Sequence, residues 1–198
     1  MKRKSMLSYK ESLKILKETN ALLEGHFVLS SGLHSDKYVQ CAQLLSKPSK
    51  AKEICLSLAE KINENFKSFD LIVSPAMGGV VIGYEIGRIL GKETIFAERV
   101  NGKFELRRGF KIQKNQKILI VEDVITTGKS SLECADMINR HHGNVIGYAC
   151  IIDRSNDKSL IKKDFVSQIK IEIPTYNKNE LPDHLKKLNP TKPGSRNL

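Results

Sequence analysis

Two adjacent carboxylates, Glu122 and Asp123, follow a run of four apolar residues that favours a buried strand. A loop with two threonines and a glycine comes next, and a helical pattern begins near Lys129. Carboxylates in this place can accept hydrogen bonds from sugar hydroxyls, directly or through a metal ion. Hydroxyls and backbone N–H groups at a helix N-terminus can hold a phosphate. The segment therefore predicts a site for a phosphorylated sugar.

The sequence Gly128-Lys129-Ser130 also invites comparison with a triphosphate-binding loop of the Walker A type. That loop requires a glycine five residues before its Gly-Lys-Ser, and this chain has Asp123 there. A carboxylate would repel the triphosphate, so we exclude this loop. A plainer alternative is a strand, a turn and a helix in which Thr126 or Thr127 only caps the helix. Adjacent acids at a strand end are costly without a ligand or metal, which favours the binding site.

The elements that would hold these residues alternate between strand and helix. Short strands are expected at residues 71–74, 94–98, 118–121 and 145–152, and helices at about 49–66, from Gly79 to about 90, and from about 129 to 142, with Gly143 as the C-cap. This alternation predicts an α/β fold with a mainly parallel sheet and helices on both faces. Ligands of such sheets bind at the carboxyl ends of the strands, where the Glu122 to Ser130 loop lies.

The two ends of the chain are expected to have a different character. Residues from about 8 to 23 predict an amphipathic helix, and residues 25–45 predict two extended pieces hinged at Gly32. Residues 168–173 alternate between apolar and polar, which predicts a half-exposed strand beside that hairpin. We expect one domain, 1–198, with a core at about 49–155, a small hood at about 20–45 and 165–176, and a loose tail at 188–198.

Composition narrows the classes of function. The net charge of +11 indicates an anionic partner, but the basic residues are dispersed and few aromatic residues are interleaved for base stacking, so a nucleic-acid partner is not favoured. No apolar stretch approaches the ~20 residues of a membrane span. The four cysteines are scattered without a Cys-x-x-Cys pair, which indicates reduced cysteines in a cytoplasmic protein rather than a zinc site or disulfides.

The segment from Glu122 to Ser130 resembles the ribose-phosphate-binding signature of the type I phosphoribosyltransferases. Further segments extend the resemblance, in the same order along the chain, to the orotate phosphoribosyltransferase family. They are residues 25–36, 74–79, 96–99, 106–110, 153–154 and 192–196. Within them, Ser-Gly-Leu-His-Ser and Leu-Arg-Arg-Gly-Phe make the resemblance specific for the substrate.

This resemblance implies a type I phosphoribosyltransferase fold with a small hood. It also implies transfer of the 5-phosphoribosyl group from 5-phospho-α-D-ribose 1-diphosphate to orotate, with Mg²⁺, in pyrimidine biosynthesis. It implies a homodimer in which a mobile arm, residues 98–109, closes over the active site, often that of the neighbouring subunit. A phosphoribosyltransferase for a purine or for uracil, and a non-catalytic nucleic-acid-binding regulator of the same fold, remain alternatives.

The resemblance also implies which residues form the site. The catalytic residues would be Lys103, Arg99 and Asp123. The phosphoribosyl diphosphate would be bound by Glu122, Asp123, Val124, Ile125, Thr126, Thr127, Gly128, Lys129, Ser130, Gly78 and Gly79. Orotate would contact Thr126 and Arg154, whose guanidinium fork suits a planar anion with a carboxylate. Mg²⁺ would be held mainly through substrate and water, with Glu122 and Asp123 as further candidates.

Several of these residues have plainer interpretations. Gly78 and Gly79 could form only a tight turn, and Arg154 could pair with Asp153 or Asp157 at the surface. Asn101-Gly102 predicts a two-residue hairpin turn. The arm segment could therefore be a structural hairpin with no role in the reaction.

Other basic and histidine residues are also open to interpretation. Arg107 and Arg108 could belong to a solvated basic face, and we interpret His26 and His34 as hydrogen-bonding structural histidines. Some relatives carry lysines where this chain has Ser30 and Gly78, so Lys103, Arg99 and Mg²⁺ would carry the cationic role.

Overall fold

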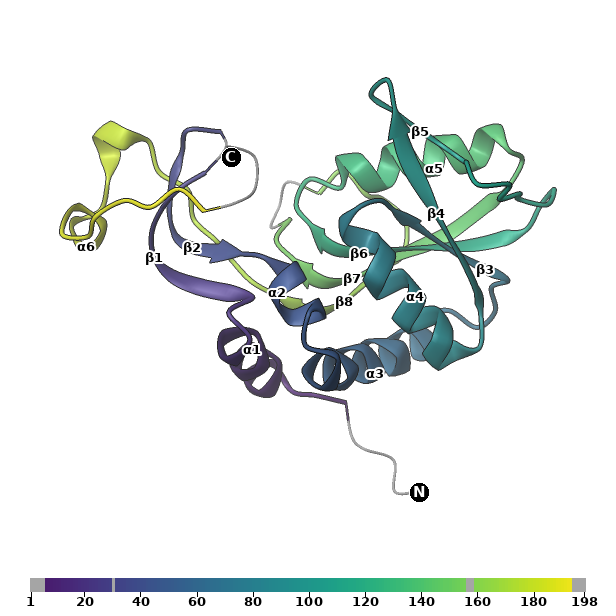
Figure 1. Cartoon of the computed structure of the whole chain (residues 1–198), viewed down its shortest axis with the longest axis horizontal. Helices are drawn as coiled ribbons and strands as arrows, with labels where there is room; N and C mark the ends of the chain where they lie inside the picture. Colours follow the sequence, from purple (N-terminus) through teal and green to yellow (C-terminus); the bar gives the residue numbers. More distant parts are fainter. Residues whose placement is uncertain (1–5, 30, 156–158, 194–198) are drawn as a thin grey trace.

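The structure is a computed structural model that describes residues 6–29, 31–155 and 159–193. Its main sheet has the strand order β5–β4–β3–β6–β7–β8 (Figure 1). The strands are β3 (Leu71–Pro75), β4 (Glu93–Val100), β5 (Lys103–Glu105), β6 (Lys117–Ile125), β7 (Asn144–Asp153) and β8 (Phe165–Lys170). Only the pairing of β4 with β5 is antiparallel. The expected mainly parallel α/β sheet is confirmed.

The central strand β6 is longer than its apolar run indicated. Ile118 to Val121 are completely buried, as expected for a parallel strand covered on both faces. Pairing with β7 continues beyond them, and Glu122 lies opposite Cys150 while Ile125 lies opposite Asp153. The carboxylates of Glu122 and Asp123 therefore belong to the strand itself rather than to the loop after it.

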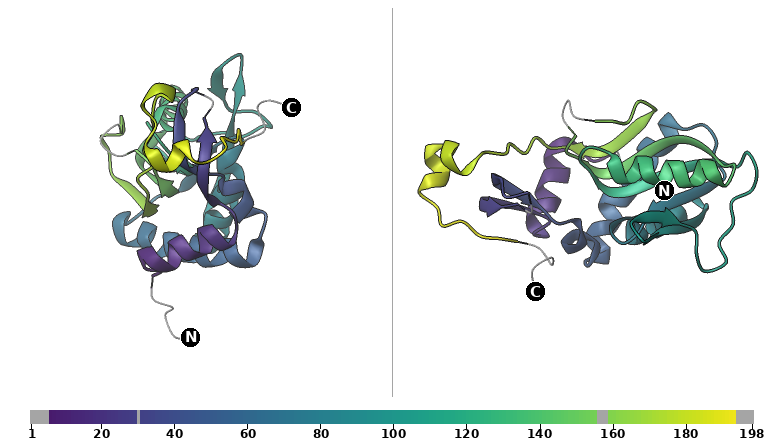
Figure 2. Two further views of the ribbon diagram at one scale, coloured as in Figure 1. Left: turned by 90° about the vertical axis from the view of Figure 1, so that its left-hand side faces the viewer. Right: turned by 90° about the horizontal axis from the view of Figure 1, so that it is seen from above.

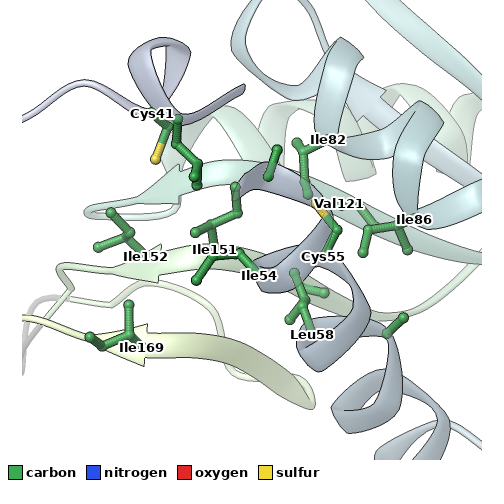
Figure 3. Packing of buried hydrophobic residues seen from close by; sticks show 14 of the residues in the cluster. Cys41, Ile54, Cys55, Leu58, Ile82, Ile86, Val121, Ile151, Ile152 and Ile169 are labelled. Atoms are coloured by element: carbon green, nitrogen blue, oxygen red, sulfur yellow. The ribbon is translucent and has the colours of Figure 1, made fainter. Parts of the chain in front are cut away.

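Helices cover both faces of this sheet, as expected. On one face lie α1 (Tyr9–Glu18), α3 (Pro48–Asn65) and α4 (Gly78–Leu90), and on the other lies α5 (Lys129–Arg140) (Figure 1). Ile54 and Leu58 of α3 pack with Ile82 of α4 and with Val121 of β6 (Figure 3). The next residue back along β6, Ile120, belongs to the second cluster, under α5. Successive residues of β6 thus face opposite layers, which fixes the directions of the two acids that follow.

A hood stands apart from the main sheet (Figure 2, right). It consists of the antiparallel hairpin β1 (Leu22–Val28) and β2 (His34–Val39), which confirms the predicted hairpin, and of residues 174–193. Those residues include the short helices η2 (Lys178–Glu180) and α6 (Asp183–Lys186). Thr191 pairs with one edge of the hairpin and Tyr176 with the other. The hood is therefore assembled from both ends of the chain.

The two hood histidines are buried and hydrogen-bonded to each other. His26 Nε2 lies 2.7 Å from His34 Nδ1, and His26 Nδ1 lies 3.0 Å from the carbonyl oxygen of Leu188. Their interpretation as structural histidines is confirmed.

The predicted strand at residues 168–173 was assigned to the wrong sheet. β8 pairs with β7 in the main sheet, with Ile169 opposite Ile152, and the chain reaches the hood only after it. Gln168, which we expected on an exposed face, is 3% exposed and donates a hydrogen bond to Ser12 Oγ at 2.9 Å. Alternation marks a buried face but does not identify the partner strand. Here helix α1 also covers Gln168, while Lys170 and Glu172 are exposed as expected.

Two helix ends differ from those predicted, and one helix was not predicted. α1 ends at Glu18, because Asn20 adopts a left-handed φ of 60° and the Ala21 N–H bonds back to the Leu16 carbonyl oxygen. A short helix, α2 (Cys41–Leu45), follows β2 where we expected extended chain. At the end of α5 the left-handed residue is His142, with a φ of 61°, rather than Gly143.

The C-terminal segment is attached over the part that the structure describes. The Thr191 N–H donates to the His26 carbonyl oxygen, and the Val28 N–H donates to the Thr191 carbonyl oxygen, both at 2.8 Å. These bonds attach the part of the expected loose tail around Thr191 to the hairpin, and residues 194–198 of that tail lie outside the described residues. None of the helices in the described ranges combines the length and apolar character needed to cross a membrane. The four cysteines are buried and free.

Candidate active site

The loop after β6 encloses a small polar pocket at the N-terminus of α5. The pocket holds about 90 Å³ and is lined by Glu122 and by residues 124–131. The first N–H groups of a helix have no partner inside the helix, so those of α5 are available to an anion in this pocket. The structure thus brings the residues expected to bind the sugar phosphate around one cavity, with the exception of Asp123 and the two glycines.

Gly128 shapes this loop and cannot be replaced without strain. Its φ is +80°, in the region that favours glycine. A Cβ atom on Gly128 would also stand 2.7 Å from the Cγ1 atom of Ile161, which packs against the back of the loop. The Leu160 N–H donates to the Thr127 carbonyl oxygen at 2.9 Å and fixes the loop from the same side.

The two carboxylates of β6 point to opposite faces of the sheet. Glu122 faces α5 and accepts a hydrogen bond from Ser131 Oγ at 2.9 Å. Burial raises the pKa of Glu122 to about 7, the Ser131 hydrogen bond lowers it, and the charge of Asp123 raises it further. Asp123 lies beside α4, its Oδ1 accepts from the Val124 N–H at 2.9 Å, and burial raises its pKa too.

Gly78 and Gly79 allow α4 to approach β6 closely. A Cβ atom on Gly78 would stand 2.8 Å from Asp123 Oδ1, and one on Gly79 would stand 3.1 Å from the Val121 carbonyl oxygen. A turn alone would not require this, so the contact with Asp123 gives Gly78 a role beyond a tight turn. Any larger side chain at Gly78 would require the Asp123 carboxylate to shift.

The arm segment forms a hairpin that projects from the edge of the sheet (Figure 1). Asn101 and Gly102 have φ values of 51° and 81°, which confirms the predicted two-residue turn between β4 and β5. The Lys103 side chain is exposed and makes no hydrogen bond or ion pair with the residues that the structure describes. Arg108 forms an ion pair with Glu98 at 2.8 Å, and Arg107 is exposed.

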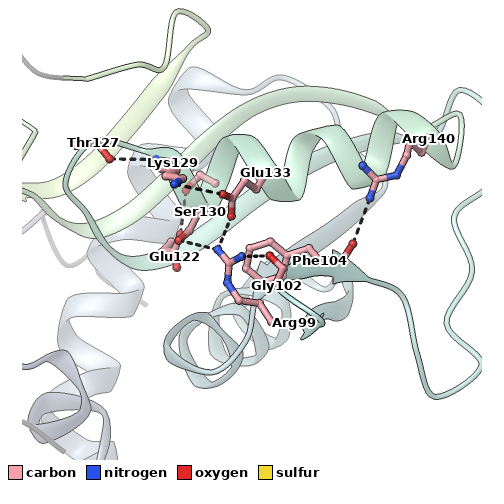
Figure 4. Close-up of polar contacts among 10 residues, drawn as sticks. Arg99, Gly102, Phe104, Glu122, Thr127, Lys129, Ser130, Glu133 and Arg140 are labelled. Atoms are coloured by element: carbon pink, nitrogen blue, oxygen red, sulfur yellow. Dashed lines mark hydrogen bonds and ion pairs between the residues drawn. The ribbon is translucent and has the colours of Figure 1, made fainter. Parts of the chain in front are cut away.

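Arg99, at the base of the arm, lies close to the pocket but has other partners. Its guanidinium forms an ion pair with Glu133 of α5, donates to the Gly102 carbonyl oxygen at 2.8 Å, and approaches Ser130 Oγ at 3.5 Å (Figure 4). It also lies 4.2 Å from the centre of the Phe104 ring. The arm is therefore joined to the helix that begins at the phosphate-sized pocket.

Comparison with known proteins identifies the family. Residues 41–187 match the phosphoribosyl transferase domain family. Over 187 residues, which are 94% of this chain and 97% of the relative, the chain is 44% identical to a protein of Erythrobacter litoralis named orotate phosphoribosyltransferase. The chain belongs to the orotate phosphoribosyltransferase family. This confirms the resemblance seen in the sequence.

Solved structures agree with the fold of an orotate phosphoribosyltransferase but do not by themselves select the base. The Aeropyrum pernix orotate phosphoribosyltransferase matches with a TM-score of 0.66, at 23% identity, over 80% of this chain and 93% of that one. An adenine phosphoribosyltransferase of Thermoanaerobacter pseudethanolicus matches with a TM-score of 0.59, at 19% identity, over 68% and 88%. The same architecture therefore serves both bases, and the sequence likeness carries the assignment.

Arg154, which the family resemblance assigns to orotate, is half-buried between the sheet and the hood. Its Nε is buried and has no hydrogen-bond partner among the described residues. Burial lowers the pKa of Arg154, an effect opposed by the nearby Tyr38 and Cys41. The alternative of an ion pair with Asp153 is not seen; Asp153 Oδ1 instead accepts from the Ser155 N–H and Oγ. Asp157 lies outside the described residues.

Sequence reasoning missed two residues of this site, Ser131 and Glu133. Glu133 lies four residues after Lys129, a spacing that predicts the contact seen between the Lys129 Nζ and Glu133 Oε1 atoms at 4.0 Å. Its second partner, Arg99, comes from a distant strand and leaves no local signal. Ser131 is recognisable only once the start of α5 is known to within one residue, which sequence patterns do not give.

Proposed function

We propose that this protein transfers the 5-phosphoribosyl group from 5-phospho-α-D-ribose 1-diphosphate to orotate, forming orotidine 5′-phosphate and diphosphate. The observation that carries the proposal is the 44% identity to a named orotate phosphoribosyltransferase over 94% of the chain. The pocket at the start of α5 supports it, because its size and its donors suit a phosphate.

The pocket and the strand before it account for the sugar phosphate. Thr126, Thr127 and Ser130, with the N–H groups of the first turn of α5, would hold the 5-phosphate. Glu122, which lines the same pocket, would accept hydrogen bonds from the ribose hydroxyls. Asp123 and Gly78 would face the other side of the sugar, where the missing side chain of Gly78 lets the diphosphate approach the backbone.

Orotate would bind between this pocket and the hood. Arg154 supports this placement, because its buried Nε has no partner among the described residues and a guanidinium can hold a carboxylate by two hydrogen bonds. Thr126 lines the pocket, and the Arg154 N–H donates to the carbonyl oxygen of the residue before it, Ile125, at 2.8 Å. A nitrogen of the orotate ring would displace the diphosphate at the anomeric carbon through an oxocarbenium-like transition state, and no side-chain nucleophile is needed.

The leaving diphosphate gains negative charge in the transition state. Lys103 is the cation we assign to it, because its ammonium has no competing partner among the described residues. Closure of the arm would also exclude water from the oxocarbenium-like centre.

Mg²⁺ is the proposed cofactor. The described residues contain no cluster of three or more His, Cys, Asp or Glu side chains that could hold a metal alone. Glu122 and Asp123 point to opposite faces, so they fit an ion held mainly by substrate oxygens and water, with one carboxylate contributing. When bound, Mg²⁺ would offset the charge of the diphosphate.

We also propose that the protein is a cytoplasmic homodimer in which the arm acts across the interface. An apolar stripe on α4 supports a partner surface beside the site. Met77, Val81 and Tyr84 are 82%, 52% and 67% exposed and lie one helical turn apart. Sedimentation of the protein, with a Tyr84→Glu variant as the comparison, would test the dimer.

The deciding experiment measures diphosphate release with phosphoribosyl diphosphate, Mg²⁺ and each of orotate, hypoxanthine, adenine and uracil. We expect turnover with orotate and none with the other three bases. Turnover with another base in place of orotate would assign the protein to a different specificity. Absence of turnover with every base, together with salt-sensitive nucleic-acid binding, would indicate a regulator.

A further inference from the structure

The side chain of Ser131 joins the first turn of α5 to the end of β6. Ser131 is completely buried, and its hydroxyl donates to Glu122 Oε2 at 2.9 Å. Glu122 lies beside this turn of the helix (Figure 4), and both residues belong to the wall of the pocket after β6. A helix residue and a strand residue thus meet through one hydrogen bond at the place proposed for the sugar phosphate.

This hydrogen bond is not the usual one for a serine inside a helix. Such a serine commonly donates to the carbonyl group four residues earlier. Ser12 of α1, which is equally buried, does so, with the Ser8 carbonyl oxygen at 3.0 Å. For Ser131 that carbonyl belongs to Thr127, and it accepts from the Leu160 N–H at 2.9 Å. The Ser131 hydroxyl is therefore directed to the carboxylate rather than to its own helix.

The groups around Glu122 give its charge little compensation. Burial raises the pKa of Glu122 to about 7, and the negative charge of Asp123 acts in the same direction. The hydrogen bond from the helix serine and the guanidinium of Arg99 on β4 lower it, and the hydrogen bond has the larger effect of the two. Cys134 of α5 and Cys150 of β7 also lie near Glu122, and burial raises the pKa of both thiols, so they are neutral.

The protonation state of Glu122 determines what the carboxyl group can offer to a sugar. An ionised carboxylate accepts hydrogen bonds at both oxygens, whereas a protonated one has a donor in place of one acceptor. With Ser131 bound to Oε2, Oε1 and the remaining lone pair of Oε2 are left for two hydroxyl groups. The serine thus orients the carboxylate and favours the form that can accept both hydroxyls of a ribose.

We propose that Ser131 is a positioning residue, whose hydroxyl holds the Glu122 carboxylate in the wall of the pocket and keeps it able to accept the two ribose hydroxyls of the sugar phosphate. The inference deepens the proposed function and rests on it for its kinetic consequence. Ser131 acts through Glu122 and is not assigned a contact with the substrate.

The pH profile of kcat/KM for phosphoribosyl diphosphate tests this role, because it reports the ionisation of groups in the free enzyme. Loss of a hydrogen bond to a charged group should move the acid limb of the Ser131→Ala profile upward by about one pH unit. At pH 6, kcat/KM should then be about tenfold below that of the unaltered protein, and at pH 9 the two should agree within about threefold. Protonation of the substrate cancels in this comparison, because both proteins receive the same substrate. An unmoved acid limb, or an equal loss at both pH values, overturns the proposal.

The matched control is Ser12→Ala, which removes a serine that is equally buried in a helix away from the pocket. Its kcat/KM should stay within about twofold of the unaltered value at both pH values, provided that thermal unfolding shows the variant to be folded at the assay temperature. In a Glu122→Gln background, Ser131→Ala should change kcat/KM by less than about twofold, because the ionisable group is gone. A full tenfold loss in that background would show that Ser131 acts elsewhere and overturns the proposal.

Infrared spectroscopy gives a readout that does not depend on turnover. The carbonyl band of the protonated Glu122 carboxyl group is identified as the one that Glu122→Gln removes, and its disappearance with rising pH follows the ionisation of that group. The midpoint should lie about one pH unit higher in Ser131→Ala and should be unchanged in Ser12→Ala. An unchanged midpoint in Ser131→Ala overturns the proposal. A protein without orotate turnover would refute the proposed function, and the infrared midpoint would still decide whether Ser131 controls Glu122.

Discussion

Gly78 lies directly against the carboxylate of Asp123, since a Cβ atom at Gly78 would stand 2.8 Å from Asp123 Oδ1. We expect Gly78→Ala to lower kcat/KM for phosphoribosyl diphosphate about tenfold or more, because Asp123 must move to make room. Alanine ordinarily stabilises a helix relative to glycine by roughly 0.5–1 kcal/mol. The contact with Asp123 should offset this gain, so we expect activity to fall and stability to change little. Arg88→Ala, at an exposed position later in the same helix, is the control. Full activity of Gly78→Ala would show that the position of Asp123 is not critical.

Lys103 is expected to act on the transition state more than on binding. Lys103→Ala should lower kcat about a hundredfold and change KM for phosphoribosyl diphosphate much less, because the ammonium meets charge that develops only as the diphosphate leaves. Steady-state kinetics would check this, with Lys52→Ala on the exposed side of α3 as the control. An unchanged kcat would remove Lys103 from its proposed role.

Arg154 should contribute to the binding of orotate and not to the binding of the sugar phosphate. Arg154→Ala is expected to raise KM for orotate about 10- to 100-fold, which is the cost of hydrogen bonds to a charged partner. KM for phosphoribosyl diphosphate should stay within a few-fold. Equal losses for both substrates would place Arg154 in the support of the fold rather than in recognition of the base.

Gly128 and Gly91 provide a matched pair for the shape of the loop between β6 and α5. Both have a positive φ, +80° and +63°, but only Gly128 faces a close neighbour, while Gly91 faces open space. Alanine should cost roughly 1–2 kcal/mol of backbone strain at both positions. At Gly128 the contact with Ile161 should add about 1–3 kcal/mol. Urea unfolding would measure both, and equal losses would contradict the tight packing of the loop.

The raised pKa of Glu122 makes a prediction about stability and pH. The folded-state pKa is about 7, against an ordinary value of 4.5, because burial disfavours the charged form. The contribution of the buried, neutral Glu122 side chain to folding stability is complete below pH 4.5, where the folded and unfolded states are both protonated. This contribution is lost as pH rises through 7, where the buried side chain must become charged. At pH 8 the unaltered protein should therefore have lost about 3 kcal/mol relative to Glu122→Gln, compared with the difference at pH 4.5. A constant difference between the two proteins across this range would refute the burial effect.

The sequence predicts the strands of the sheet well because their signal is local. Ile118 to Val121 form a short apolar run of β-branched and leucine residues, which favours a strand covered on both faces. The residues from 168 to 173 also carry a local signal, but the choice of partner strand depends on the distant surfaces of α1 and β7. Alternation contains no information about them.

The site was predicted by residue type, and its geometry was not. Glu122 and Asp123 were recognised as a pair, but the strand was expected to end before them. Once β6 extends to Ile125, the two-residue period of a strand sends one acid toward α5 and the other toward α4. The partner of Arg99 could not be predicted, since its contact with Glu133 spans 34 residues.

The hood draws on two distant segments of the chain, and this has a consequence for the order of folding. The contacts of His26 with Leu188 and Thr191 join residues separated by 162 and 165 positions. Closing so long a loop is slow compared with forming the neighbouring helices and strands. The β1–β2 hairpin can form by itself, whereas its contacts with Leu188 and Thr191 require the intervening domain to bring the two segments together. The hood is thus expected to be completed among the last parts of the fold.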